Sequence, residues 1–83
     1  MTPSKAQRAF IRSSAQLALL IRQARLAQGF SQLRLAETAG IRQTTLSDFE
    51  RNPSKARIET AFRLLTALGL ELRGANPSAG KEQ

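Results

Sequence analysis

The 83-residue sequence contains no cysteine and no histidine, and these two absences remove most enzymatic chemistry from consideration. Without them the chain offers no thiol nucleophile, no histidine general base and no ordinary zinc site, so we expect neither a metal nor a cofactor. Its 6 acidic residues are scattered, and no glycine-rich phosphate-binding loop is present. We therefore predict that the protein is not an enzyme.

Long apolar runs are also missing from the sequence. The longest spans residues 17–21, which is far shorter than the roughly 20 residues that a transmembrane helix needs. No signal-peptide pattern is present at the start of the chain. We expect a cytoplasmic protein without membrane association, and the lack of cysteine agrees with a reducing compartment.

Acidic residues are few relative to basic ones, with 6 Asp and Glu against 13 Lys and Arg and a formal charge of +7. Such an excess predicts an anionic partner, and with a membrane disfavoured this partner is nucleic acid. A chain of this length forms one small domain, and a core of that size is marginal alone. Dimerisation is therefore expected before any motif is considered.

Periodicity and helix-ending residues predict an all-α domain of four to five helices at residues 13–74, between a basic arm (1–12) and a disordered tail (75–83). The expected helices cover residues 15–28, 32–39, 42–51 and 57–68, with a short additional helix in the arm left open. Serines at the helix starts, glycines at the ends and Asn52-Pro53 set these limits. The apolar positions expected to face the core are Leu17, Leu20, Ile21 and Ala24 in the first helix and Ile58, Ala61, Phe62, Leu65 and Leu68 in the last.

Residues 70–73 alternate apolar and charged side chains, which is the period of a β-strand. No other segment of the chain offers this strand a partner. The simplest partner is the same strand in a second copy of the chain. We therefore predict a short C-terminal strand that pairs across a dimer, with Leu70 and Leu72 on one face and Leu68 beside them at the interface.

Residues 29–52 predict a helix-turn-helix, because two short helices are joined by a tight turn at Gly40. Leu35, the small Ala36 and Ala39 are expected to face inward from the first helix, and Ile41, Leu46 and Phe49 from the turn and the second helix. This pattern holds the second helix outward, where the major groove of double-stranded DNA can accept it.

The ordered set of motifs resembles the Cro/phage-repressor (Xre) type of helix-turn-helix, which has a lambda-repressor-like fold. The resemblance covers about residues 16–70 and rests on IRQARLAQGFSQLRLAETAGIRQTTLSDFERNP followed by IETAFRLLTALGL. Residues 12–74 are most similar to HipB-type antitoxins through SAQLA, GIRQTTLSDFERNP and ALGLELRG. This resemblance implies strand pairing across a dimer, a HipA-like serine/threonine kinase toxin as partner, and autorepression of a shared operon.

The exposed start of the second helix supplies the candidate base-contacting side chains. Gln43 can bond an adenine through two hydrogen bonds, Arg42 suits guanine or a phosphate, and Thr44 can meet a thymine methyl group. Ser47 and Asp48 share this face, although an acid near DNA either accepts from cytosine N4 or points aside. The alternative for all five is an ordinary polar surface.

Five further residues are candidates for phosphate contacts. Gln32 begins the preceding helix, where free amides favour anions and where the resemblance implies a phosphate-binding glutamine. Lys55 and Arg57 follow the second helix of the motif, the recognition helix, in a loop expected to lie along the DNA backbone. Arg22 and Arg34 complete the set, whereas Arg51 and Arg63 are equally well explained as solvated charges.

Arg25 and Glu50 stand at the positions where the resemblance implies a structural ion pair between the first helix and the recognition helix. We predict a pair that is at least partly buried and that sets the angle of the recognition helix. The alternative is two solvated charges.

Taken together, these features predict a homodimeric, sequence-specific repressor that binds a palindromic operator in the bacterial nucleoid and serves as the antitoxin of a HipA/HipB-like type II module. Three alternatives stay open at this point. They are a solitary or phage-type Xre regulator without a toxin, an inhibitory protein-interaction module that uses the arm and tail, and a non-specific basic nucleic-acid binder.

Overall fold

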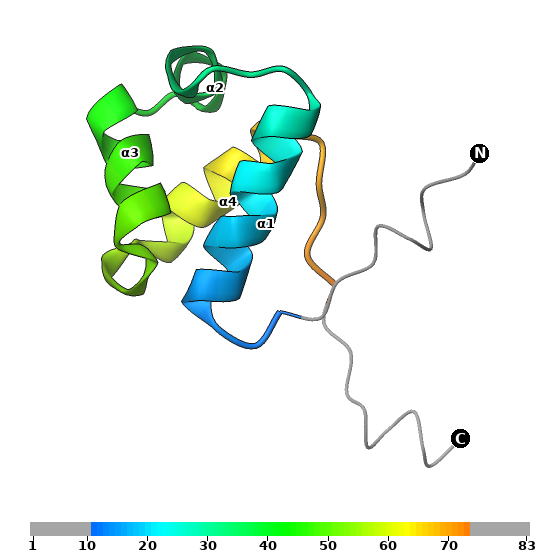
Figure 1. Cartoon of the computed structure of the whole chain (residues 1–83), viewed down its shortest axis with the longest axis vertical. Coiled ribbons are helices and arrows are strands. Elements are labelled where there is room, and N and C mark those ends of the chain that lie inside the picture. The colour runs from blue at the N-terminus through cyan, green and yellow to red at the C-terminus, as the bar shows by residue number, and fades with distance from the viewer. Residues whose placement is uncertain (1–10, 74–83) are drawn as a thin grey trace, which may run out of the picture.

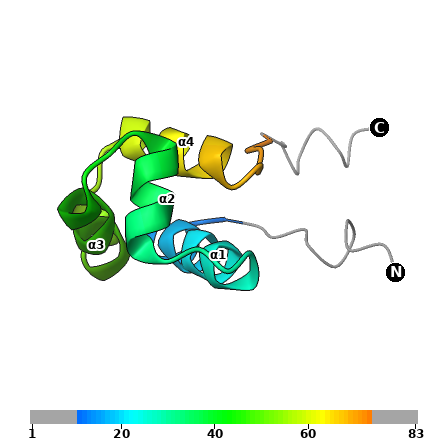
Figure 2. The ribbon, with the colours of Figure 1, turned by 90° about the horizontal axis from the view of Figure 1, so that it is seen from above.

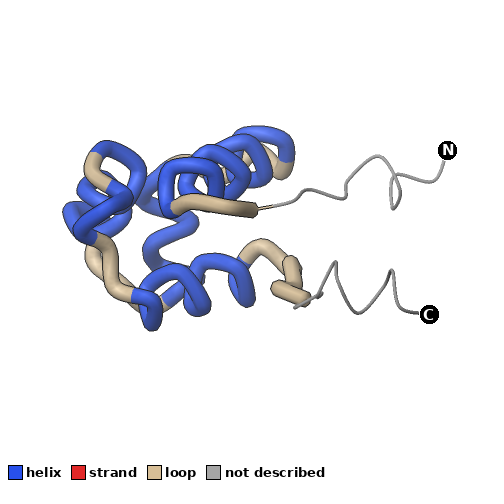
Figure 3. The backbone as a smooth tube through the Cα atoms, turned by 90° about the horizontal axis from the view of Figure 1, so that it is seen from below, coloured by secondary structure: helices blue, strands red, loops and turns tan. Residues whose placement is uncertain are grey.

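The computed structural model describes residues 11–73, and within this part four α-helices follow one another without any strand (Figures 1 and 3). The elements are α1 (Ser14–Ala27), α2 (Gln32–Ala39), α3 (Gln43–Arg51), the 3₁₀ helix η1 (Pro53–Lys55) and α4 (Ile58–Ala67). The all-α fold is thereby confirmed. The predicted tail, and the arm except its last two residues, lie outside the described residues, as does any short helix in the arm.

Local side-chain caps explain where the first two helices begin. The Ser13 hydroxyl accepts a hydrogen bond from the Gln16 amide, and the Ser31 hydroxyl accepts one from the Arg34 amide, both at 3.1 Å. Each bond satisfies one of the amides that a helix start leaves without a partner. α3 and α4 begin without a side-chain capping bond, and all four predicted helices lie within about a residue of their observed limits.

The turn between α2 and α3 depends on Gly40, which has a φ of 73° in the left-handed region. This conformation lets the Ile41 amide donate to the Ala36 carbonyl at 2.9 Å, so that the chain reverses within a few residues. A Cβ added at Gly40 would lie 3.3 Å from Nη1 of Arg63. A side chain here would therefore be strained by the backbone and crowded by α4.

The core lies where α2 packs against both α3 and α4, while α1 packs against α3 and η1. Figure 2 shows α3 at one end of this arrangement and the described ends of the chain toward the other. The inward positions predicted for the helix-turn-helix are confirmed, since Leu35, Ala36, Ala39, Leu46 and Phe49 are buried and Ile41 packs against them. α3 therefore packs through Leu46 and Phe49 and leaves its opposite side to solvent.

The predicted inward face of α4 is wrong in part. Ile58 is 73% exposed and Phe62 is 49% exposed, whereas Leu64 is fully buried. The buried stripe runs through Ala61, Leu64, Leu65 and Leu68. Two stripes with the same helical spacing compete in this sequence, and contacts with α2 select the second.

The face that α1 turns to the core is predicted only in part, since Ile21 is fully buried as expected but Leu20 is only half-buried. The buried residues of α1 are Ala18, Ile21 and Arg25. Leu17 and Ala24, which were expected inside, pack only at the edge of the core. Arg25 can be buried on this face because Glu50 of α3 pairs with it.

The expected dimer residues do not share one environment. Leu68 is 4% exposed within the core of its own chain, which leaves its side chain almost no surface for a second copy, and its place at the interface stays a prediction. Leu70 packs against the same core and Leu72 is exposed. Residues 70–73 form no strand in the single chain, and their pairing with a second copy stays a prediction.

Gln28 links the C-terminal ends of α1 and α4. Its side-chain amide donates to the Leu68 carbonyl at 2.9 Å, which joins the end of α1 to the end of α4. The segment that follows starts on the side of the domain away from α3 (Figure 2). Among the described residues, no helix is long and apolar enough to cross a membrane.

Candidate nucleic-acid interface

α3 presents a polar face to solvent. Arg42 occupies the N-cap position without a side-chain capping bond, and Gln43, Thr44 and Asp48 are exposed. Ser47 is half-buried on the same side, and the opposite side of the helix carries the core residues Leu46 and Phe49. The structure therefore brings all the predicted base-contacting residues, Arg42, Gln43, Thr44, Ser47 and Asp48, onto one accessible surface.

An ion pair between α1 and α3 holds this face in place. Nε and Nη2 of Arg25 donate to the two carboxylate oxygens of Glu50 at 2.8 and 3.2 Å. Nη1 of Arg25 donates to the Phe30 carbonyl at 3.0 Å. The two side chains are only 9% and 8% exposed, so the residues predicted to pair do meet, in a paired and largely buried geometry.

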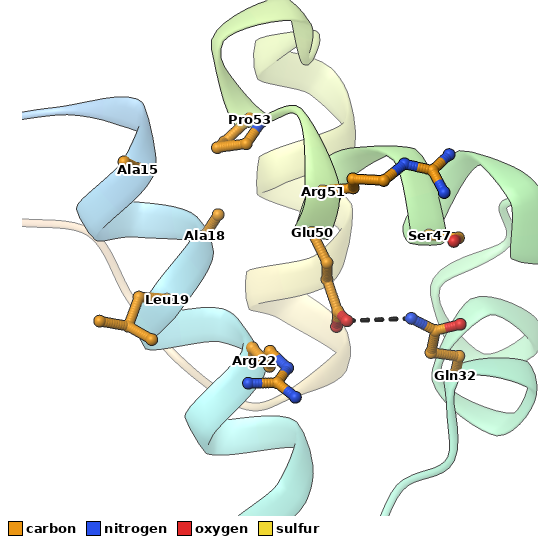
Figure 4. A pocket seen from close by; sticks show the side chains of 9 residues that line it. All are labelled: Ala15, Ala18, Leu19, Arg22, Gln32, Ser47, Glu50, Arg51 and Pro53. Atoms are coloured by element: carbon orange, nitrogen blue, oxygen red, sulfur yellow. Dashed lines mark hydrogen bonds between the residues drawn. The ribbon is translucent and has the colours of Figure 1, made fainter.

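Gln32 joins the same network from the start of α2. Its Nε2 donates to Oε1 of Glu50 at 3.0 Å, as the dashed line in Figure 4 shows. Glu50 therefore links α1, α2 and α3 through its two oxygens. Among the described residues, no buried side-chain nitrogen or oxygen lacks a hydrogen-bond partner. A buried polar network in which every group has a hydrogen-bond partner is rigid.

This contact changes how Gln32 can act as a phosphate ligand. The sequence suggests a free, exposed amide, but in the structure one of the two N–H groups of Gln32 donates to Glu50. The second N–H of the same amide group stays available for an acceptor outside the domain. A phosphate contact by Gln32 would thus be made by a side chain that the protein has already oriented.

One hollow lies on each flank of α3. The first, of about 460 Å³, is lined by residues of α1, the start of α2, α3 and η1, and Figure 4 shows its side chains. Its basic residues are Arg22 and Arg51, beside the polar Gln32 and Ser47. Its one acid, Glu50, is already neutralised by Arg25. Arg22 therefore supplies the positive charge of the hollow, because that of Arg51 is offset by Asp48. Apolar side chains of Ala15, Ala18, Leu19 and Pro53 complete the lining.

The second hollow, of about 360 Å³, lies on the other flank of α3 and extends over η1 to the start of α4. Lys55 and Arg57 supply its positive charge, and Asp48 lines its edge. α3 is thus a ridge between two basic hollows. A helix in the major groove has a sugar-phosphate backbone on each flank, and this arrangement suits such a ligand.

The predicted phosphate-contacting residues divide between these features. Arg22 and Gln32 line the first hollow, Lys55 and Arg57 line the second, and Arg34 is exposed in the first turn of α2. Sequence reasoning did not single out Arg51, which lines the first hollow and also bonds Asp48. The i,i+3 spacing of Asp48 and Arg51 on the outward face of the helix was the available signal.

Comparison with known proteins agrees with this geometry. Residues 21–74 match the family model described as Helix-turn-helix. Antitoxin HipB of Escherichia coli O6:H1 (strain CFT073) is 36% identical over 78 residues, which is 88% of this chain and 83% of that protein. Antitoxin HipB of Escherichia coli K12 is 35% identical over 78 residues, 88% of this chain and 89% of that protein. The chain belongs to the HipB family of helix-turn-helix antitoxins.

The chain is also similar to solved structures of HipB complexes. A chain in the solved structure of a HipA-HipB-O2-O3 complex is 34% identical, with a TM-score of 0.79 over 84% of this chain and 99% of that one. A chain in a HipB-O4 20mer complex is also 34% identical, with a TM-score of 0.80 over 84% and 99%. The family is one of non-enzymatic proteins, so this HipB-family chain is not an enzyme.

Proposed function

We propose that this chain is a dimeric, sequence-specific DNA-binding repressor and the antitoxin of a type II toxin–antitoxin module, which represses its own operon. The observation that carries the proposal is the outward polar face of α3, held by the Arg25–Glu50–Gln32 network between two basic hollows. A fixed helix with free polar side chains is what readout in the major groove requires. The net charge of +7 adds a sequence-independent attraction to the phosphates.

In this proposal the residues divide into two roles. Side chains at the start and centre of α3 read base edges, and basic or amide side chains on both flanks hold the backbone in register. The base-contacting set is Arg42, Gln43, Thr44, Ser47 and Asp48. The phosphate-contacting set is Gln32, Arg34, Arg22, Lys55 and Arg57.

A dimer would place two copies of α3 about 34–36 Å apart, one helical turn of DNA, so that they read a palindromic operator. The alternation of residues 70–73 and the exposure of Leu72 support a strand that pairs with its copy. An edge strand with unpaired backbone groups is a ready template for such pairing. Bound to its operator, the protein would reside in the nucleoid.

The toxin partner is proposed on the strength of the relatives. HipB occurs with HipA in a solved complex, and 84% of the present chain matches a chain of that complex. We propose that the partner here is likewise a HipA-like serine/threonine kinase. Co-expression of the adjacent open reading frame with the tagged chain, followed by purification, tests this: a kinase-fold protein in stoichiometric amount supports it, and an unaccompanied chain indicates a solitary regulator.

Footprinting on the protein's own promoter tests DNA recognition. We expect protection of a palindrome, and tighter binding to it than to a random duplex of equal length. Gln43→Ala should reduce this preference, because one base-reading side chain is lost, while Gln23→Ala, an exposed α1 glutamine, should leave it unchanged. Equal affinity for both duplexes would mean that the chain is a non-specific basic binder.

A further inference from the structure

Asp48 and Arg51 form an exposed ion pair on the C-terminal half of the outward face of α3. Nη2 of Arg51 donates to Oδ1 of Asp48 at 2.6 Å, and the two side chains are 68% and 67% exposed. Thr44, Asp48 and Arg51 follow one another at helical spacings of four and three residues, so they lie along one stripe. The pair therefore occupies the surface that the proposed function gives to DNA.

The bond draws the guanidinium of Arg51 back by one turn of the helix. Arg51 ends α3, so its backbone lies farther along the helix than the base-reading residues at the start. Its contact with Asp48 brings the charged group to the level of Asp48 and Ser47. Figure 4 shows the Arg51 side chain lying along the same side of α3 as Ser47.

The pair presents a defined pattern of donors and acceptors. Oδ2 of Asp48 has no partner among the described residues and can accept a hydrogen bond. Arg51 uses one N–H of Nη2 for Asp48 and retains its other guanidinium donors. Two parallel N–H donors thus lie next to one carboxylate acceptor, and the opposite charges of the two groups offset each other.

We propose that Asp48 and Arg51 act as one unit that recognises a G·C base pair in the major groove. In that groove a G·C pair presents two acceptors, guanine N7 and O6, followed by a donor, cytosine N4. The donor–donor–acceptor order of the ion pair matches this order. An A·T pair alternates acceptor, donor and acceptor, so it would set an adenine amino group against a guanidinium donor.

Arg51 has a second role in this unit, because it makes Asp48 compatible with DNA. An unpaired carboxylate on the recognition face would be repelled by the phosphates on both flanks. Paired with Arg51, it adds no net charge to that face. The inference rests on the proposed function. It adds one base pair that is read in each half of the operator. It also gives a role to Arg51, which the sequence alone left unassigned.

Selection of binding sites from a pool of duplexes with a randomised 20-base-pair core tests the inference. The purified wild-type chain, Asp48→Asn, Arg51→Lys and the double variant are compared at one salt concentration. We expect wild type to select a G·C pair at one position of each half-site, with a preference of roughly 5- to 150-fold over A·T. Each single variant should lose that preference, and the double variant should lose no more than either alone.

The pair of Glu59 and Arg63 on α4 provides the matched control. It is also an exposed ion pair, at 3.3 Å, but lies outside α3. Glu59→Gln with Arg63→Lys should leave the selected sequence unchanged. Circular dichroism should show native helix content in every variant, since both pairs are exposed.

Two results would overturn the inference, and they are distinguishable from failure of the proposed function. If wild type selects a sequence but both single variants keep every base preference, the pair does not read a base. If Arg51→Lys weakens binding to all sequences equally, Arg51 contacts only a phosphate. If wild type selects no sequence at all, the proposed function fails and this inference falls with it.

Discussion

Arg25 and Glu50 lie 25 residues apart in the chain and are joined by two hydrogen bonds of 2.8 and 3.2 Å in a largely buried site. This contact connects α1, which faces the core, to α3, which faces the expected DNA. Gln32 completes it from the start of α2. One carboxylate therefore connects the three helices that surround the recognition surface.

Neutralising that carboxylate should destabilise the fold. Glu50→Gln leaves the buried guanidinium of Arg25 without a counter-charge, and we expect a loss of about 3–5 kcal/mol in the free energy of unfolding. Urea titration followed by circular dichroism measures this. Glu59→Gln, which breaks an exposed pair, should cost no more than about 1 kcal/mol. Equal losses in the two variants would show that burial of the Arg25–Glu50 pair has no energetic consequence.

The buried stripe of α4 predicts that truncating the smaller Leu64 destabilises the fold more than truncating the larger Phe62. Leu64→Ala removes a fully buried side chain and should cost about 2–5 kcal/mol. Phe62→Ala removes a larger side chain that is half exposed, and should cost the isolated chain less. Thermal unfolding at low protein concentration compares the two without a contribution from assembly. A greater loss for Phe62→Ala would mean that the helix turns the other face to the core.

The two hollows predict a measurable salt dependence of DNA binding. The logarithm of the binding constant falls with the logarithm of salt concentration by about 0.9 for each phosphate neutralised on duplex DNA. Because a dimer carries two copies, Lys55→Ala and Arg57→Ala should each flatten this slope by about twice that amount. Titrations at several salt concentrations measure it.

Arg73→Ala serves as the control for these titrations, since Arg73 is exposed near the described end of the chain, away from α3 (Figure 2). Its slope should equal that of wild type, with the dimer checked by gel filtration. A slope unchanged in Lys55→Ala and Arg57→Ala would remove the second hollow from the backbone contacts.

The alternation at residues 70–73 predicts that one face of the segment controls assembly. Leu72→Lys places a charge on the apolar face and should shift the dimer toward monomer, because burying an unpaired ammonium group is unfavourable. Glu71→Lys changes the opposite face and should leave assembly intact. Sedimentation velocity over a range of concentrations separates these outcomes. A dimer that survives Leu72→Lys would have its interface elsewhere.

Local signals in the sequence are sufficient to place the helices, their limits and the helix-turn-helix. These features depend on groups a few residues apart, namely the capping hydroxyls of Ser13 and Ser31, the left-handed Gly40 and the stop at Asn52-Pro53. The sequence also placed the candidate base-contacting residues on α3, because a helix 9 residues long with one apolar side can turn only its polar side outward.

Three features follow from packing between helices and not from local signals: which of two apolar stripes of α4 is buried, how completely Leu68 is buried, and the bond between Gln32 and Glu50. The tertiary structure also decided that Arg22 and Arg51, from helices far apart in the chain, line one hollow. Each of these facts depends on how helices meet. Helical spacing defines a face but leaves its partner open, so the identity of that partner is settled by packing between distant segments.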